Sequence, residues 1–165
     1  MTRANPSSSS GRREAVRPVF RSLDRAEIDE VLRRNQVGRI AFSLHDRVDV
    51  EPIHYVYDGE WIYGRTAPGE KLSMLAHNHW LAFEVDEVRG VFDWRSVVAH
   101  GGFYMLDREG SPRDREAWEH ALTLLRTLIP ETLTDTDPAH FRTILFRVHL
   151  DDVTGRAAVP PTQAS

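Results

Sequence analysis

The sequence contains no cysteine. This absence excludes disulfide bonds, thiolate-bound metals, iron–sulfur clusters and a cysteine nucleophile. Long apolar runs are also missing, since no stretch approaches the roughly 20 residues that a membrane-spanning helix needs. The serine tract Ser7–Ser10 lacks the apolar core of a secretory signal. We therefore expect a cytoplasmic protein without a membrane partner.

A large excess of charge of one sign is missing as well, because the net charge is only −4 over 165 residues. This balance argues against a general nucleic-acid binder. Residues 1–18 carry four arginines and one glutamate, a net charge of +3, so the remaining residues carry −7. Their polar, serine-rich composition predicts a disordered basic leader. We expect residues 19–157 to form one well-cored domain and residues 158–165 a flexible tail.

Alternating apolar and polar residues predict about six strands with short connections. These strands cover residues 37–44, 48–57, a segment that begins at Trp61, 81–88, 94–106 and 143–153. Helical spacing and capping residues predict helices over residues 25–35, 71–76 and 112–129. This order predicts a mainly β (α+β) fold, a closed or partly closed antiparallel barrel with flanking helices.

Several residues carry local expectations within these elements. Pro52 cannot donate to a strand ladder, so its strand is expected to be irregular or exposed there. The pair Gly101-Gly102 predicts a bulge or a close approach of another chain segment. Trp80, Phe83 and Trp118 are expected in the core.

The stretch 61–76 resembles a phosphate-binding turn. It reads as a strand, a break at Pro68-Gly69 and a helix start, with Arg65 and Lys71 flanking the break and Thr66 adding a hydroxyl. The first N–H groups of a helix are unpaired and, with the helix dipole, attract anions. The alternative is an ordinary strand-to-helix connection with two solvated cations.

Other kinds of site find less support. His77 and His79 are two residues apart near a helix end and point to different faces, so we predict no metal site. The serines lack the strand-turn-helix context of a hydrolase nucleophile, and neither a P-loop nor a dinucleotide fingerprint is present. The turn could hold a phosphate, and the neighbouring strand around Pro52 could lie along a flat apolar ring. A phosphorylated flat heterocycle fits this outline better.

The order of several motifs resembles the pyridoxamine 5′-phosphate oxidase-like family, specifically the flavin-nucleotide-binding branch that includes nitroimidazole-resistance proteins. The runs that carry this resemblance are Val37–Phe42, Val50–Tyr55, Ile62–Lys71, Phe83–Asp86 and Trp94–Val98. The segment Phe146–Asp151 lacks the tryptophan-bearing substrate motif of the true oxidases, which argues against vitamin B6 oxidation.

This resemblance implies a split β-barrel homodimer that binds FMN at the subunit interface. It also implies an oxidoreductase in which hydride passes through the flavin to or from a small organic substrate. The implied cofactor-binding residues lie in three groups: the ring strand, the phosphate contacts and a later strand that reaches the flavin edge. They are Val50, Glu51, Pro52, Ile53 and His54, then Arg65, Thr66 and Lys71, then Trp94, Arg95 and Ser96.

Two alternatives to FMN remain open. A deazaflavin cosubstrate needs an extended basic groove, whereas outside the leader the chain offers only scattered arginines such as Arg39, Arg89 and Arg95. A non-enzymatic haem- or flavin-binding module would use a histidine as axial haem ligand, with His45, His54 and His100 as candidates.

Overall fold

The structure, a computed structural model, describes residues 17–161. Most of the predicted leader, residues 1–16, and the last four residues of the predicted tail lie outside this range. The described chain forms ten elements. The strands are β1 (Val19–Ser22), β2 (Val37–Leu44), β3 (Arg47–Tyr57), β4 (Trp61–Thr66), β5 (Trp80–Gly90), β6 (Asp93–Met105) and β7 (Ile144–Val159), and the helices are α1 (Arg25–Arg34), α2 (Glu70–His77) and α3 (Pro112–Leu128).

The seven strands form one antiparallel sheet that closes into a ring. Their order is β1-β7-β4-β3-β2-β5-β6, and β6 also pairs with β7. The ring confirms the predicted barrel with flanking helices. Short hairpins join β2 to β3, β3 to β4 and β5 to β6, because tight antiparallel turns need few residues.

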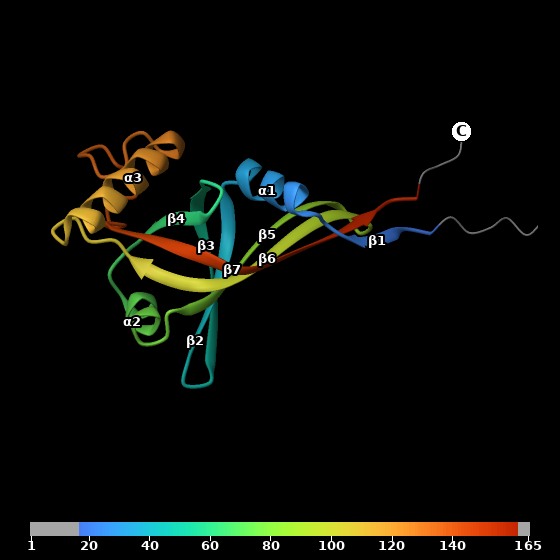
Figure 1. Cartoon of the computed structure of the whole chain (residues 1–165), viewed down its shortest axis with the longest axis horizontal. Coiled ribbons are helices and arrows are strands. Elements are labelled where there is room, and N and C mark those ends of the chain that lie inside the picture. The colour runs from blue at the N-terminus through green and yellow to red at the C-terminus, as the bar shows by residue number, and fades with distance from the viewer. Residues whose placement is uncertain (1–16, 162–165) are drawn as a thin grey trace, which may run out of the picture.

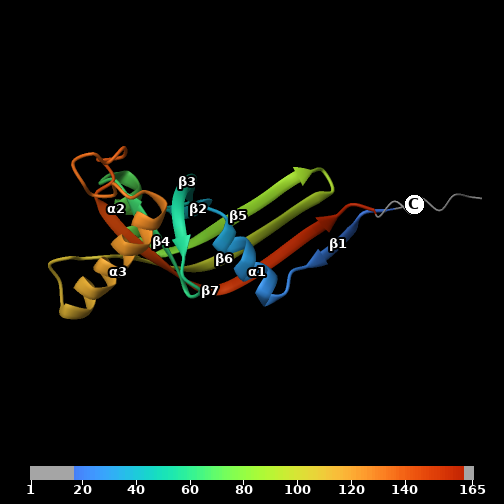
Figure 2. The same cartoon turned by 90° about the horizontal axis from the view of Figure 1, so that it is seen from above.

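The elements give the molecule a body and an arm. In Figure 1, α3 lies at one end, the β2–β3 hairpin projects from the body, and β1 lies along the far end of β7. Figure 2 shows β5, β6 and β7 running together along the length of the molecule, with α1 lying across them. The arm therefore consists of the distal halves of these three strands together with β1.

Two apolar clusters hold the helices on the sheet. The larger cluster fills the barrel and receives Val31 and Leu32 from α1 and Leu75 from α2. The smaller cluster lies between α3 and the outer face of β4 and β7, with Tyr63 and Leu145 buried against Leu125. Burial of large apolar side chains is worth roughly 1.5–3 kcal/mol each, so these clusters fix where each helix packs on the sheet.

The helices differ at their first residues. α1 and α3 each begin with a capping box, formed by Asp24 with Glu27 and by Ser111 with Asp114. The box in α1 confirms the prediction from spacing. At α2 the N-cap is Gly69, which provides no side-chain hydrogen bond. The first N–H groups of α2 therefore receive no side-chain cap.

Three expectations were wrong in detail. The four residues of β1 are all exposed, so they show no apolar alternation, and this strand escaped prediction. The last strand continues past residue 153 to Val159, because β6 and β1 pair with its end. Trp80 is 52% exposed rather than in the core, whereas Phe83 is fully buried as expected.

Two predicted irregularities are confirmed. β3 pairs with β2 over its whole first half, but with β4 only from Tyr55 to Tyr57, so Pro52 lies on a segment with one free edge. The register of β6 against β7 shifts between His100 and Gly101. There, a Cβ on Gly101 would lie 1.6 Å from the carbonyl oxygen of His149.

Candidate functional site

The candidate site is built around the turn from β4 to α2. Thr66, the last residue of β4, is buried, and its hydroxyl is 3.4 Å from the carbonyl oxygen of Ala67. A Cβ on Gly69 would meet no atom within 4 Å, so there is open space in front of the helix start. An uncapped helix N-terminus beside open space is a favourable position for an anion.

Lys71, the second residue of α2, is a cation at this helix start. Its ammonium group is 2.5 Å from a carboxylate oxygen of Glu51 on β3. The Lys71 side chain is 17% exposed and that of Glu51 42%, so the pair is only partly screened by water. The turn predicted Lys71 and the family resemblance implied Glu51 as site residues, but neither showed that their side chains meet.

A second, more exposed group of charges borders the turn. Arg47 bonds the carboxylate of Glu70 at 2.9 Å and that of Asp49 at 3.1 Å. Together with Lys71 and Glu51, the turn is bordered by two cations and three carboxylates. The cation-flanked turn read from the sequence is thus close to neutral, or slightly acidic, once the fold brings β3 beside it.

Arg65 faces away from this turn. It lies on the outer face of β4 with Tyr63, and its guanidinium forms a two-pronged ion pair with Asp137 in the loop after α3. Both side chains are almost fully buried. The hydrogen bonds from Arg65 hold the pKa of the Asp137 carboxyl well below its usual range. The Asp137 carboxylate also accepts hydrogen bonds from the backbone N–H groups of Leu133 and Ala139.

The ring strand proposed from the resemblance, residues 50–54 of β3, has two distinct faces. Val50, Pro52 and His54 are exposed on the outside of the barrel. Ile53 is buried in the core, and Glu51 on the same side reaches Lys71. Because β4 does not pair with this segment, the backbone groups along one edge of β3 have no strand partner.

Residues 94–96 lie on the arm. Ser96 pairs with Asp86, six residues along β5 from Trp80, so it lies roughly 20 Å from the end of β5 that follows α2. The Ser96 hydroxyl is 3.3 Å from Glu84, whereas Arg95 points to the other side of the sheet, toward Glu30 of α1. Trp94 packs near Phe20. A single chain therefore does not bring residues 94–96 to the α2 turn.

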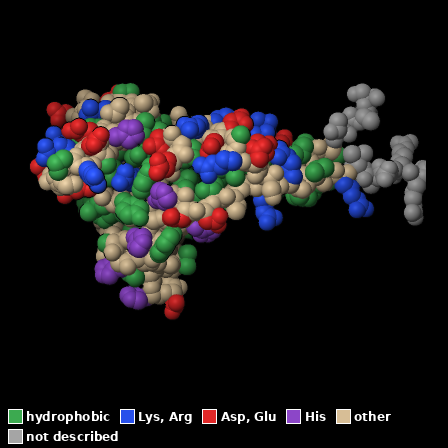
Figure 3. All heavy atoms as spheres, viewed as in Figure 1, with side chains coloured by type: hydrophobic (Ala, Val, Ile, Leu, Met, Phe, Trp, Pro, Cys, Tyr) green, Lys and Arg blue, Asp and Glu red, His purple; other side chains and the backbone are tan. Residues whose placement is uncertain are grey.

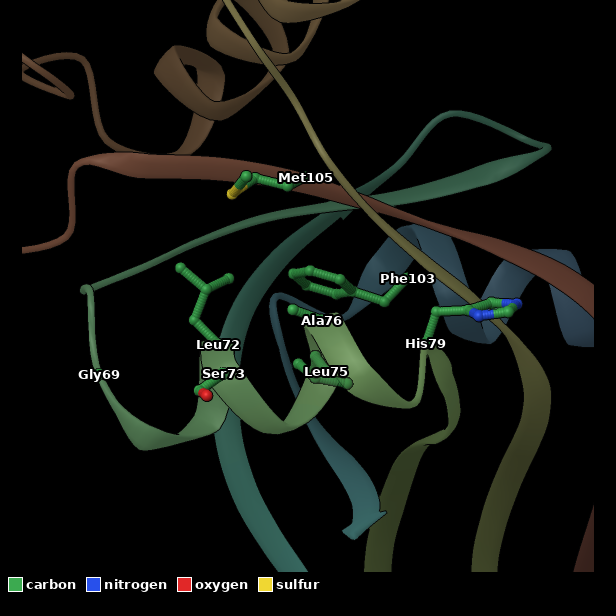
Figure 4. A pocket seen from close by; sticks show the side chains of 8 residues that line it. All are labelled: Gly69, Leu72, Ser73, Leu75, Ala76, His79, Phe103 and Met105. Atoms are coloured by element: carbon green, nitrogen blue, oxygen red, sulfur yellow. The ribbon is translucent and has the colours of Figure 1, made fainter.

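An apolar groove beside α2 was not anticipated. Figure 4 shows Leu72 and Leu75 of α2 facing Phe103 and Met105 of β6 across a hollow that reaches Gly69. Its volume is about 560 Å³. The groove joins residues more than 25 positions apart, and ordinary apolar periodicity gave no sign that these side chains would leave a cavity.

Charges of both signs are dispersed elsewhere on the described surface, whereas most of the histidines visible in Figure 3 gather on the lower part of the body, around the β2–β3 hairpin. Figure 3 shows basic and acidic side chains interspersed along the body and arm on the face that it presents. Arg39 bonds Glu84 and Asp86. The three haem-ligand candidates are all exposed, His45 in the β2–β3 turn and His54 and His100 on strands. Within residues 17–161 no group of three metal-ligating side chains is found, and no helix is long and apolar enough to cross a membrane.

Ring closure, a free edge on β3 and the position of the α2 turn define the chain as a split β-barrel. Residues 24–157 match the family model described as pyridoxamine 5′-phosphate oxidase. The chain belongs to this pyridoxamine 5′-phosphate oxidase-like family.

Three similar proteins illustrate the family. An uncharacterized protein of Rhizobium meliloti (strain 1021) is 27% identical over 150 residues, which cover 84% of this chain and 95% of that protein. A crystal structure of a FAD-binding protein from Mesorhizobium loti is 26% identical, with a TM-score of 0.67 and coverage of 86% and 98%. A proposed 5-nitroimidazole antibiotic resistance protein from Bacteroides thetaiotaomicron, 19% identical with a TM-score of 0.65 and coverage of 86% and 89%, shares the fold.

Proposed function

We propose that this protein binds a flavin nucleotide, with FMN as the cofactor that the family implies. The observation that carries the proposal is the uncapped start of α2, with Lys71 beside it, next to a segment of β3 that has one free edge. The helix start and Lys71 would hold the phosphate. The free backbone groups of β3 would hydrogen-bond the polar edge of the flavin ring.

The proposal assigns different roles to the predicted site residues. Residues 50–54 provide the ring strand, and Thr66 and Lys71 border the phosphate. Arg65, which is buried against Asp137, acts as a positioning residue that fixes the end of β4. A direct contact of Arg65 with the phosphate would require breaking that pair and stays a prediction.

The proposal includes a homodimer with the cofactor at its interface. The outer face formed by β3, β2, β5 and β6 carries the exposed side chains of Val48, Val50 and Trp80. A second copy on this face would cover them and could bring Trp94 and Ser96 of the partner to the α2 turn. A two-fold dimer is the commonest way to cover such a surface.

We further propose an oxidoreductase. A bound flavin supplies hydride transfer, so the protein has to orient the ring and substrate and exclude water. The apolar groove beside Gly69, which is lined by Leu72, Phe103 and Met105, suits an apolar organic substrate. The absence of cysteine agrees with the cytoplasmic location that we include in the proposal.

The two alternative cofactors are less well supported. An acidic deazaflavin tail needs free cations, but Arg39 is paired with Glu84 and Asp86, and Arg95 lies 3.7 Å from Glu30. Haem needs a histidine in an apolar cavity, but the candidates His45, His54 and His100 are exposed. The groove of Figure 4 contains His79, whose ring points away from Leu72 and Met105.

The test is an absorbance spectrum of the freshly purified protein, taken again after incubation with FMN and desalting. The proposal predicts flavin bands near ~370 and ~450 nm that persist through the column, because a bound flavin is the chromophore. A colourless protein that does not retain FMN would contradict it. A Soret band after addition of haem would support the haem alternative instead.

A further inference from the structure

The main cation of the proposed phosphate site is already neutralised by the protein. Lys71 lies 2.5 Å from Glu51, and their side chains come from α2 and β3, two elements that the fold holds beside each other. The pair is partly buried, so salt and water screen it less than an ordinary surface pair. A phosphate that approaches Lys71 therefore also approaches the carboxylate of Glu51.

No other cation of the described turn compensates for this carboxylate. Arg65 is buried against Asp137 on the other face of β4. Arg47 is shared between Glu70 and Asp49. The field at the helix start consequently has a fixed negative contribution from Glu51, which a phosphate must tolerate.

The cost of that contribution depends on the charge of the phosphate. A phosphate monoester carries a charge of about −1.5 to −2 at pH 7, because its second pKa is about 6. The diphosphate of FAD also carries two negative charges in total, but one on each phosphorus atom, so only one of them lies on the phosphate next to the flavin's ribityl chain. Coulomb repulsion grows with charge and falls with distance, so Glu51 repels the charge concentrated on a monoester at the helix start more strongly than that of a diphosphate whose second charge lies further away.

We propose that Glu51 is a specificity-determining residue that weakens the binding of dianionic phosphate monoesters, such as FMN, relative to flavins whose first phosphate carries a single charge, such as FAD. The inference rests on the proposed flavin site. In this inference the carboxylate of Glu51 discriminates between ligands by charge, whereas its backbone is part of the ring strand. Removing this single charge shifts the selectivity of the site toward the monoester.

The experiment compares riboflavin, FMN and FAD as ligands of the full chain by equilibrium fluorescence titration. The variants are Glu51→Gln, which removes the charge at constant shape, and Glu60→Gln, which removes the same charge from the β3–β4 turn at the other end of β4. For Glu51→Gln we expect FMN affinity to rise roughly threefold relative to FAD, with riboflavin nearly unchanged. Glu60→Gln is expected to leave the ratio at the wild-type value.

A second readout separates charge selectivity from a general structural effect. Below pH 6 the phosphate of FMN becomes monoanionic. The Glu51→Gln effect on the FMN-to-FAD ratio should therefore shrink between pH 8 and pH 5.5, whereas a packing change would not follow the titration of the phosphate.

Two results would overturn the inference. The first is an equal change in affinity for all three flavins, or none, in Glu51→Gln. The second is a shift in the ratio that is independent of pH. If none of the flavins bound to any of the proteins, the proposed function itself would fail, and this inference with it.

Discussion

The two cations that flank the turn before α2 lie in different environments. Lys71 sits at the surface of the site, where a ligand can compete with Glu51 for its charge. Arg65 is almost fully buried and forms two hydrogen bonds with Asp137, which lies 72 residues further along the chain. Removing one partner of such a buried pair leaves the other charge without solvent or counter-ion. We therefore infer that Arg65 stabilises the fold and that Lys71 binds the ligand.

The Arg65–Asp137 pair leads to the first prediction. Asp137→Ala should lower the free energy of unfolding by about 3–5 kcal/mol, because it leaves the guanidinium of Arg65 buried and unpaired. Urea denaturation of both proteins measures the difference. The control is Glu30→Gln, which breaks an exposed pair with Arg34 and should cost about 1 kcal/mol or less. Equal, small losses in both variants would contradict the structural role of Arg65.

A second prediction concerns how the stability of the fold changes at acidic pH. Since the pKa of Asp137 is lowered in the folded state by its bonds from Arg65, the unfolded state takes up a proton at higher pH than the folded state does. The contribution of Asp137 to stability is complete above its unfolded pKa of about 4 and falls as the pH drops below it. The stability difference between the wild type and Asp137→Asn should therefore narrow by about 1 kcal/mol from pH 5 to pH 3. A constant difference in denaturation curves over this range would be inconsistent with the pair.

At the scale of elements, the long strands β6 and β7 depend on one irregular position. The register shift after His100 brings the backbone of β7 against Gly101, where a Cβ would lie 1.6 Å from the carbonyl oxygen of His149. Only a residue without a side chain fits there. This close approach continues the β6–β7 ladder into the arm and closes the ring.

The third prediction tests this position. Gly101→Ala should destabilise the protein by about 3 kcal/mol, since the methyl group forces the two strands apart. The matched change Gly90→Ala, at the last residue of β5, meets its nearest atom at 3.9 Å and should cost far less. Thermal unfolding monitored by circular dichroism compares the two. Similar melting temperatures for both variants would show that the ladder tolerates a Cβ at residue 101.

Sequence patterns predicted those elements whose signals are local. The interval of three between Asp24 and Glu27 marked the start of α1, and alternation gave β2 with its observed bounds. The exposed residues of β1 carry no such pattern, because this strand exists only through pairing with the distant end of β7. Trp80 was misplaced for a related reason: its size favours burial, but the sheet face on which it lies is left uncovered within residues 17–161.

The same distinction applies to the site at the scale of the whole molecule. The turn, the helix start and Lys71 are neighbours in sequence and were predicted together. The engagement of Arg65 by Asp137 and of Lys71 by Glu51 depends on packing between segments 72 and 20 residues apart, which a single sequence does not show. The wide separation of residues 94–96 from the α2 turn within one chain also appears only in the fold.

The fourth prediction is the assembly. Because exposed apolar side chains gather on the face of β2, β3 and β5, we expect the 18.9 kDa chain to behave as a dimer in size-exclusion chromatography with light scattering. Trp80→Glu should shift the protein toward the monomer. Phe141→Glu, a matched change in the loop after α3, should leave it dimeric. A wild-type monomer at micromolar concentration would contradict the proposed interface.

The measurement that tests the central claim most directly is a titration of the wild type and of Lys71→Ala with FMN and with riboflavin, followed by flavin fluorescence. The account predicts that loss of the Lys71 charge weakens FMN binding by roughly tenfold to a hundredfold and leaves riboflavin binding nearly unchanged, because only FMN carries the phosphate. Equal FMN affinity in the two proteins, or equal losses for both ligands, would show that the phosphate does not lie at the start of α2.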